Sequence, residues 1–362
     1  TQSRGHRAND LRPARARWSG VTAVAWRYVF LPLAPLYRAA VATRVAAYER
    51  GWMRRGRLDV PVISVGNLTF GGTGKTPTVI ALVRDLIGLG RRPAVLTRGY
   101  KRRGDEQIVV VGPEPRHTVE QVGDEPIEMA RRLPGVPVVV DADRERGGLA
   151  AQRLGADVVV LDDGFQHLRL ERNLDLVLLD AGDPWGGGRL PPMGRLREPI
   201  SAVRRADAVL ITKVLADWRP VVARIESVVD EIDPTLQVFV ARMKPTRVQK
   251  PGGGWEPAES LAGCRVHACA GLGRPEGFMA TLEAAGATVV GSTWFPDHHE
   301  YSPEDVASVI KAAQRADAVV VTTGKDKVKL PPDADIWVIE AEMEPIEGSW
   351  RGLWRLLPGL SV

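Results

Sequence analysis

Residues 61–76 read PVISVGNLTFGGTGKT, a short apolar strand and a glycine-rich loop that ends in Gly74-Lys75-Thr76 before a helix-like segment. Such loops point backbone N–H groups at phosphate oxygens, and the next helix adds the positive end of its dipole. The lysine then reaches the β- and γ-phosphates, and the threonine hydroxyl binds Mg²⁺. We therefore predict a nucleotide-binding P-loop that consists of Thr69, Phe70, Gly71, Gly72, Thr73, Gly74, Lys75 and Thr76.

One position departs from the usual pattern G-x-x-x-x-G-K-[ST], because Thr69 stands where that pattern begins with glycine. The alternative to a P-loop is a glycine-rich turn between a strand and a helix that binds no ligand. The strand before the loop and the intact Gly-Lys-Thr favour the P-loop.

The composition is that of an ordinary folded protein. The chain has 362 residues, enough for two domains, with 44% hydrophobic and 26% charged residues. Its two cysteines, Cys264 and Cys269, have no Cys/His set at metal-ligand spacing beside them, which favours a reducing compartment and argues against structural zinc.

Apolar runs alternate with helix-length segments from residue 60 onward, and a second series starts near Val238. Runs that are apolar throughout indicate a parallel sheet covered on both faces. We expect an α/β protein with a P-loop NTPase-like, doubly wound parallel sheet domain at 51–236 and a smaller α/β domain at 237–362. The polar stretch 250–257 is the expected loop into the second series.

The first 60 residues carry twelve arginines, no lysine and three acids, hence a charge of +9, while the other 302 residues sum to −4. Aromatic and aliphatic residues between Trp18 and Tyr48 are interrupted by arginines and prolines, so a regular membrane-crossing helix is not expected. We predict that residues 1–50 form a helical segment in the membrane interface, so that the protein is either peripheral or held by a single N-terminal anchor. An ordinary docked helix is the alternative, and no recognition-helix pattern supports nucleic-acid binding.

Further candidate residues follow predicted strands. Asp162 and Asp163 end the apolar run 158–161, where ligands bind in parallel sheets, and we predict that they bind Mg²⁺ rather than being merely solvated. Asp124 opens a predicted helix over 127–133, either as a proton acceptor or as an N-cap, and spacing alone favours the cap. Arg98-Gly-Tyr100 is either a phosphate or sugar contact or a plain turn, and Asp297-His298-His299 offers a carboxylate–imidazole pair.

Together these motifs resemble one family, the tetraacyldisaccharide 4'-kinases (lipid A 4'-kinases), and the likeness extends from about residue 25 over nearly the whole chain. The motifs occur in the family's order: GNLTFGGTGKTP (66–77), RGY (98–100), GDEP (123–126), LDDGFQH (161–167), LREP (196–199), GLGRPE (271–276), PDHH (296–299) and KD (325–326). The glycine-rich run 186–188 is the part that fits the family pattern least.

The resemblance implies transfer of the γ-phosphate of ATP to the 4'-hydroxyl of a lipid A disaccharide 1-phosphate, at the cytoplasmic face of the bacterial inner membrane. It also implies two α/β domains joined by a two-stranded hinge, which we place at 237–242 and 336–340. For the site it implies Lys75 on the phosphates, Asp124 as base assisted by His298, Mg²⁺ at Thr76, Asp162, Asp163 and Glu198, and substrate contacts at Arg98, Tyr100, Glu125, Gln166 and His167.

Two other functions stay open at this point. A partition- or septum-type ATPase would carry a lysine before Gly71-Gly72, where this chain has Phe70. A non-catalytic, membrane-docked scaffold would bind nucleotide without phosphorylating a glycolipid. A GTPase is disfavoured because Thr212-Lys213 lacks the aspartate of the guanine-reading motif.

Overall fold

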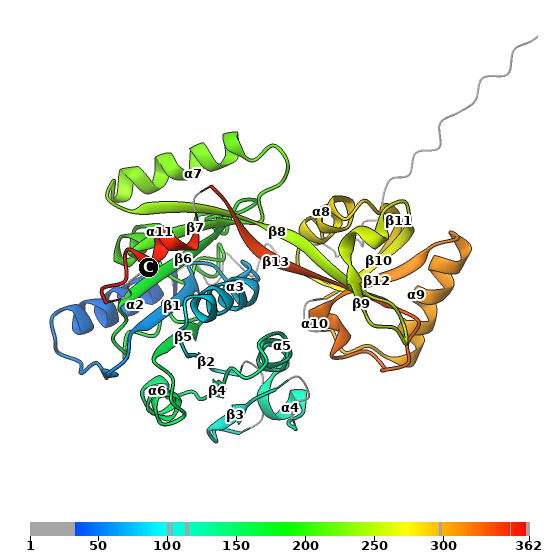
Figure 1. Cartoon of the computed structure of the whole chain (residues 1–362). Coiled ribbons are helices and arrows are strands. Elements are labelled where there is room, and N and C mark those ends of the chain that lie inside the picture. The colour runs from blue at the N-terminus through cyan, green and yellow to red at the C-terminus, as the bar shows by residue number, and fades with distance from the viewer. Residues whose placement is uncertain are drawn as a thin grey trace, which may run out of the picture.

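The structure of the protein is a computed structural model, and it describes residues 33–99, 102, 104–112, 116–296, 299–347 and 349–359 (Figure 1). Tyr100, Asp297, His298 and most of the predicted N-terminal segment therefore lie outside the described residues.

A single large sheet runs through the molecule in the order β11-β10-β12-β13-β8-β7-β6-β1-β5-β2-β4-β3, with β9 paired to β8 at the side. Most neighbouring strands are parallel, whereas β3 with β4, β8 with β13, and β8 with β9 are antiparallel. The strands are β1 Val62–Asn67, β2 Pro93–Thr97, β3 Ile108–Val110, β4 Val138–Val140, β5 Val158–Asp162, β6 Leu174–Asp180, β7 Ala208–Thr212, β8 Gln237–Gln249, β9 Trp255–Pro257, β10 Arg265–Gly271, β11 Thr288–Phe295, β12 Val319–Thr323 and β13 Trp337–Glu347.

The sheet has two halves, each covered on both faces. We call the part from β1 to β7 the P-loop half and the part from β10 to β12 the C-terminal half. The helices are α2 Leu33–Glu49, α3 Lys75–Gly88, α4 Val119–Val122, α5 Asp124–Arg132, α6 Arg144–Arg153, α7 Arg219–Ile232, α8 Glu276–Ala284, α9 Pro303–Arg315, α10 Gly324–Lys327 and α11 Trp350–Trp354, with 3₁₀ turns η1 Ile200–Arg205 and η2 Ala258–Leu261.

The buried clusters show which helices cover which face. In the P-loop half, α3, α5 and α11 pack on one face, and α6 and α7 pack on the other. In the C-terminal half, α8 and α9 cover opposite faces. The expected α/β class with buried, apolar strands is therefore confirmed, as a large mixed sheet.

Two long strands join the halves, as Figure 1 shows. The first residues of β8 pair with β7. Strand β13 begins beside β12 and runs antiparallel to β8 over most of its own length. The predicted hinge segments 237–242 and 336–340 fall at the starts of these strands, which extend farther than the sequence pattern indicated. Because β8 and β13 pair on both sides, the two series of strands form one sheet, not two.

The carboxyl ends of the parallel strands of the P-loop half meet at one edge of the sheet. Each of five strands there ends in a buried polar residue: Asn67 on β1, Thr97 on β2, Asp162 on β5, Asp180 on β6 and Thr212 on β7. Buried polar groups need partners or ligands, and in open α/β sheets ligands bind beyond this edge. The edge is therefore the place to look for the site.

Helix α2 packs against the loops that follow β5 and β6. The Tyr37 hydroxyl donates a hydrogen bond to the Arg197 carbonyl (2.9 Å), and Arg44 donates to the Gln166 carbonyl (3.2 Å). Within the described residues, no helix combines the length and the apolar character needed to cross a bilayer.

Candidate functional site

The predicted P-loop links β1 to α3. Gly74 stands before the first residue of the helix in a left-handed conformation (φ 85°), and a Cβ there would lie 3.2 Å from the Met343 side chain. Glycine is therefore favoured at this position for both its backbone and its close packing. The start of α3 directs its free N–H groups and its positive dipole end toward the loop, as an anion site requires.

Thr69, the departure from the usual pattern, lies two residues beyond the end of β1. It forms an antiparallel bridge with Leu196, its carbonyl accepts a hydrogen bond from the Asn67 amide (2.8 Å), and it is 5% exposed. The next residue reinforces the bridge, because the Phe70 amide donates to the Arg195 carbonyl (2.7 Å). An extended residue needs no glycine, which explains how threonine is accepted here.

Lys75 points back over the loop toward the adjoining strand end. Its Nζ lies 3.4 Å from Asn67 Oδ1 and 3.4 Å from Asp163 Oδ1. Arg197 also holds Asp163, with Nη1 at 2.8 and 2.9 Å from the two carboxylate oxygens. Burial alone would raise the pKa of Asp163, but Lys75 and Arg197 outweigh it and lower that pKa, so the carboxylate is charged.

Asp162, the neighbouring acid, has a different environment. Its Oδ2 accepts a hydrogen bond from the Thr97 hydroxyl (3.0 Å), whereas its Oδ1 is buried without a hydrogen-bond partner among the described residues. Burial raises the pKa of Asp162, and the charge of Asp163 adds to the rise. A buried oxygen without a partner, next to a phosphate loop, fits a position that a cation would satisfy.

No group of three or more His, Cys, Asp or Glu side chains in the described ranges is arranged to hold a metal ion alone. Mg²⁺ in nucleotide sites takes much of its coordination from phosphates and water, so a small protein contribution is expected. Thr76 and Asp162 fit that contribution, whereas Asp163 is engaged by two cations. Glu198 is 4% exposed and pairs with Arg205.

A second set of charges fixes the other side of the loop. Lys213 follows β7 and donates to the Gly72 carbonyl, while its Nζ lies 3.0 Å from Asp180 Oδ2. Arg274, in the loop after β10, lies 3.4 Å from Asp180 Oδ1. Thr212 adds a hydrogen bond to the Thr73 carbonyl (2.8 Å). These contacts attach the P-loop to the next strands and bring a cation from the C-terminal half to its edge.

A cavity of about 480 Å³ opens between this loop and the C-terminal half. Its walls come from the P-loop, α5, the two connecting strands and α8. They include Gly71–Pro77, Glu125, Glu128, Arg132, Lys213, Met243, Arg274, Phe278, Lys325, Glu340 and Met343. Phosphate-binding amides on one wall and apolar side chains on the others suit a nucleotide.

Two glutamates in the cavity wall have raised pKa values. Burial, with a contribution from Asp162, raises the pKa of Glu125 to about 8, so the group is mostly neutral at pH 7. Burial also raises the pKa of Glu128, although Arg132 lowers it in part (3.5 Å). Arg132 donates to the Ala341 carbonyl (2.8 Å) and lies 3.9 Å from Glu340, which ties α5 to β13.

Asp124 is the first residue of α5, and Gly123 occupies the N-cap position. The expectation that Asp124 caps this helix from the N-cap position is therefore wrong. Asp124 is buried, and its carboxylate accepts the Glu125 amide (3.1 Å) and lies 3.3 Å from Lys329 Nζ of the C-terminal half. The buried aspartate is thus held at the junction of the two halves.

Three of the residues expected around the acceptor, Gln166, His167 and Arg98, lie at the same edge. Gln166 donates to the Asn67 carbonyl (2.9 Å) and accepts from Arg197 (3.2 Å), so it belongs to the cluster of Lys75 and Asp163. His167 is half-buried, and burial together with Arg144 lowers its pKa to about 4, which keeps the imidazole neutral. Arg98 is exposed at the end of β2.

Residues of the Asp297-His298-His299 motif are only partly described. His299 binds Asp305 (3.0 Å) and stacks on Phe295, at 4.5 Å between ring centres, so its imidazole is used within the C-terminal half. Asp326 of the Lys-Asp motif is fully buried and accepts the Thr323 hydroxyl (2.7 Å). This acid fixes the turn that starts α10.

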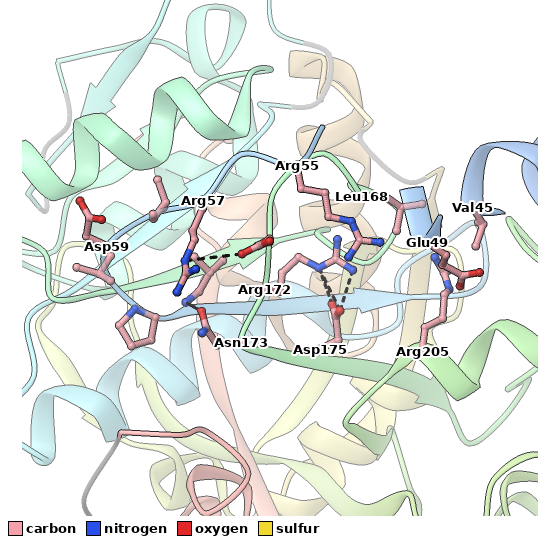
Figure 2. A pocket seen from close by; sticks show the side chains of 15 residues that line it. Val45, Glu49, Arg55, Arg57, Asp59, Leu168, Arg172, Asn173, Asp175 and Arg205 are labelled. Carbon is pink, nitrogen blue, oxygen red and sulfur yellow. Dashed lines mark hydrogen bonds and ion pairs between the residues drawn. The ribbon is translucent and has the colours of Figure 1, made fainter. Parts of the chain in front are cut away.

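A second cavity, of about 560 Å³, lies at the opposite edge of the sheet, beside α2 and the starts of β1 and β6 (Figure 2). Its lining is highly charged, and several of the charges pair with one another or with neighbours. Arg172 binds Asp175 (2.8 Å), Arg57 lies 3.8 Å from Glu171, and Arg205 pairs with Glu198. This cavity shares no lining residue with the cavity at the phosphate loop and does not extend it.

Sequence reasoning missed several side chains of the site. Lys213 and Asp180 directly follow or end apolar strands, so the rule that identified Asp162 would also have identified them. Arg274 lies within the motif 271–276 but was given no role. Nothing in the local pattern indicated Lys329 or Arg132, because their partners are distant in sequence.

Comparison with known proteins agrees with this geometry. The family model for LpxK, tetraacyldisaccharide-1-P 4'-kinase, matches residues 26–357. The chain is 40% identical over 321 residues to a tetraacyldisaccharide 4'-kinase of Geobacter sulfurreducens, covering 87% of this chain and 88% of that one. It is 44% identical over 333 residues to the enzyme of that name from Anaeromyxobacter dehalogenans, covering 87% of each.

A solved structure is similar as well. It is described as the "apo" form of LpxK from Aquifex aeolicus in complex with ATP, and it has a TM-score of 0.71 and 32% identity, covering 91% of this chain and 98% of that chain. The family match spans most of the chain, and so do both relatives. The chain therefore belongs to the tetraacyldisaccharide-1-P 4'-kinase family.

Proposed function

We propose that the protein transfers the γ-phosphate of ATP to the 4'-hydroxyl of a tetraacyldisaccharide 1-phosphate, giving the 1,4'-bisphosphate in lipid A biosynthesis. As a member of this family it is an ATP-dependent kinase that acts on a hydroxyl group. The observation that carries the proposal is the cavity of about 480 Å³, which joins the phosphate loop to Glu125 at the start of α5. The ATPase and scaffold alternatives receive no support from the relatives.

In this proposal the triphosphate lies along Gly71–Thr76, with Lys75 on the β- and γ-phosphates. Lys213 and Arg274 hold the outer side of the loop through Asp180. Phosphoryl transfer depends mainly on positioning and charge stabilisation, and a fixed set of cations around the loop supplies both. Part of the adenosine would occupy the apolar section of the cavity near Met243, Phe278 and Met343.

Thr76 and Asp162 are the residues we assign to Mg²⁺, because Asp162 Oδ1 is buried without a hydrogen-bond partner among the described residues. When bound, Mg²⁺ would neutralise charge on the phosphates. Asp163 and Glu198 remain further candidates. Asp163 has a second role in any case, since it orients Lys75 and Arg197.

Asp124 is the proposed acceptor of the proton from the 4'-hydroxyl, with His298 assisting from outside the described residues. Arg98, Tyr100, Glu125, Gln166 and His167 are proposed around nucleotide and acceptor. His167 has a pKa of about 4, so it would act there as a neutral hydrogen-bonding group.

Residues 51–236 would form the catalytic core domain, on which α11 also packs, and residues 237–362 otherwise a second domain, with β8 and β13 as the hinge between them. We also propose that the protein binds the cytoplasmic face of the bacterial inner membrane through residues 1–50. The turn after α2 supports this, because Trp52 is 72% exposed and Met53 44% exposed between exposed arginines. Exposed tryptophan with arginine is typical of segments at a bilayer interface.

The test is incubation of the purified chain with Mg-ATP and tetraacyldisaccharide 1-phosphate, followed by mass spectrometry of the lipid. The proposal predicts addition of one phosphate to the lipid with one ADP formed per product. ATP hydrolysis at the same rate with and without the lipid would instead indicate an ATPase. Nucleotide binding without turnover would indicate a scaffold.

A further inference from the structure

One ion pair links the two halves at the proposed catalytic base. Asp124 begins α5 in the P-loop half, and Lys329 follows α10 in the C-terminal half. Lys329 Nζ lies 3.3 Å from Asp124 Oδ2, and the side chains are only 9% and 6% exposed. A pair so far from water attracts more strongly than a surface pair, and removing one charge leaves the other buried and uncompensated.

The lysine is presented from a well-fixed turn. Its backbone amide donates to the Asp326 carbonyl (3.0 Å). The Asp326 side chain is fully buried and is held by the Thr323 hydroxyl (2.7 Å) and the Gly271 amide (3.3 Å). The backbone that carries the ammonium group is therefore fixed, and the position of the ammonium group depends on the C-terminal half.

The two oxygens of the aspartate are held from different halves of the molecule. Oδ1 accepts the amide of Glu125 on its own helix (3.1 Å), and Oδ2 faces Lys329 (3.3 Å). Two contacts of this kind restrict rotation of the carboxylate. A general base must be ionised and aimed at the hydroxyl whose proton it accepts.

We infer that Lys329 is a positioning residue for phosphoryl transfer. It orients the Asp124 carboxylate, so that the orientation of this base depends on the C-terminal half. The inference rests on the proposed function, in which Asp124 accepts the proton of the sugar hydroxyl. In that step the hydroxyl oxygen forms a bond to the γ-phosphorus, the bond from this phosphorus to the β,γ-bridging oxygen breaks, and ADP leaves. The proton moves to Asp124, while Lys329 keeps its own.

The first test is Lys329→Met, which keeps most of the side-chain volume and removes the charge. We expect kcat to fall by roughly 10²-fold, the scale of a misplaced catalytic group, with the KM for ATP unchanged. Lys329→Arg keeps the charge and should restore part of the lost kcat. Lys327→Met, a change two residues earlier at the end of α10, is the matched control and should behave like the parent.

The second test asks whether Lys329 acts through Asp124. Adding Lys329→Met to Asp124→Asn should lower kcat little further, because residues that act as one unit are strongly non-additive. Losses that multiply would overturn the inference, and so would Lys329→Met with unchanged kcat. Reduced ATP affinity or a lower melting temperature in Lys329→Met without a specific kcat loss would assign the lysine to docking of the halves. No lipid product from the parent protein would refute the proposed function itself.

Discussion

Replacing Lys75 by alanine should lower kcat strongly and the stability of the fold only slightly, because the side chain contributes much to catalysis and little to folding. In the folded protein Lys75 is held at 3.4 Å by both Asn67 and Asp163, and its side chain is 14% exposed. The ammonium group thus lies beside the loop, at the place where phosphate oxygens would bind. Removing it deletes a preorganised cation but leaves the loop backbone in place.

The catalytic loss follows from the role of such a cation. Loss of one preorganised group that stabilises transition-state charge costs about 10²–10³ in kcat, or about 3–4 kcal/mol. The loss of stability should be far smaller. The Lys75–Asp163 contact is long, the Asp163 side chain is 38% exposed, and Arg197 still holds that carboxylate at 2.8 Å. A partly exposed pair of this kind contributes about 0–1 kcal/mol.

The assay is steady-state kinetics on the lipid acceptor together with thermal unfolding of the same preparations. We expect kcat to fall by about 10²–10³, with a decrease in melting temperature of no more than about 2–4 °C. Lys244→Ala is the matched control, since Lys244 is a 55% exposed lysine that pairs with Glu344 on the connecting strands. Lys75→Ala with kcat close to the parent would refute the assignment of the phosphate site, and cooperative unfolding at a much lower temperature would refute the stability argument.

Four more expectations follow from the site. Asp162→Asn should raise the Mg²⁺ concentration needed for half-maximal activity, because an amide is a poorer ligand for a hard cation; an unchanged Mg²⁺ titration would make this carboxylate structural. Glu125→Gln should stabilise the fold relative to the parent increasingly as pH rises. The folded-state pKa of about 8 lies above the ordinary value of 4.5, so the parent loses stability as pH rises from 4.5 to about 8. The melting temperature of the variant relative to the parent should therefore climb from about pH 5 to pH 8 and then level off, and a constant difference would contradict the raised pKa. Deleting residues 1–50 should abolish co-sedimentation with anionic vesicles while ATP binding persists, and retained sedimentation would mean that another surface binds lipid. Asp124→Ala and His298→Ala should each lower kcat by roughly 10²–10⁴ with little change in ATP affinity, and the double variant should be barely worse than the worse single one unless the two act independently.

The sequence predicted the parts of the fold and site that depend on neighbouring residues. The P-loop, the buried strands and Asp162 are recognisable because a strand, its loop and its terminal polar residue are contiguous in the chain. The same rule would have found Asp180 and Lys213. Thr69 breaks the usual pattern without harm because it is extended and bridged to Leu196, a contact that only the folded chain reveals.

What the sequence did not predict depends on pairing between distant segments. The length of β8 and β13 and the continuous sheet arise from strand partners on both sides, and apolar periodicity contains no information about partners. The Asp124–Lys329 and Arg132–Glu340 contacts likewise join distant segments. The partner of Glu198, Arg205, was not predicted either, and the role of Glu198 at Mg²⁺ stays a prediction.

The position of the transferred phosphate provides the most direct test of the proposed reaction. The purified protein would be incubated with ATP labelled in the γ-phosphate and with tetraacyldisaccharide 1-phosphate, and the lipid would then be treated with mild acid. An anomeric phosphate is released by this treatment, whereas a phosphate ester at the 4'-hydroxyl is retained. We predict that the label enters the lipid and stays on it after the acid step. Label that is released with the anomeric phosphate, or that never enters the lipid, would contradict transfer to the 4'-hydroxyl.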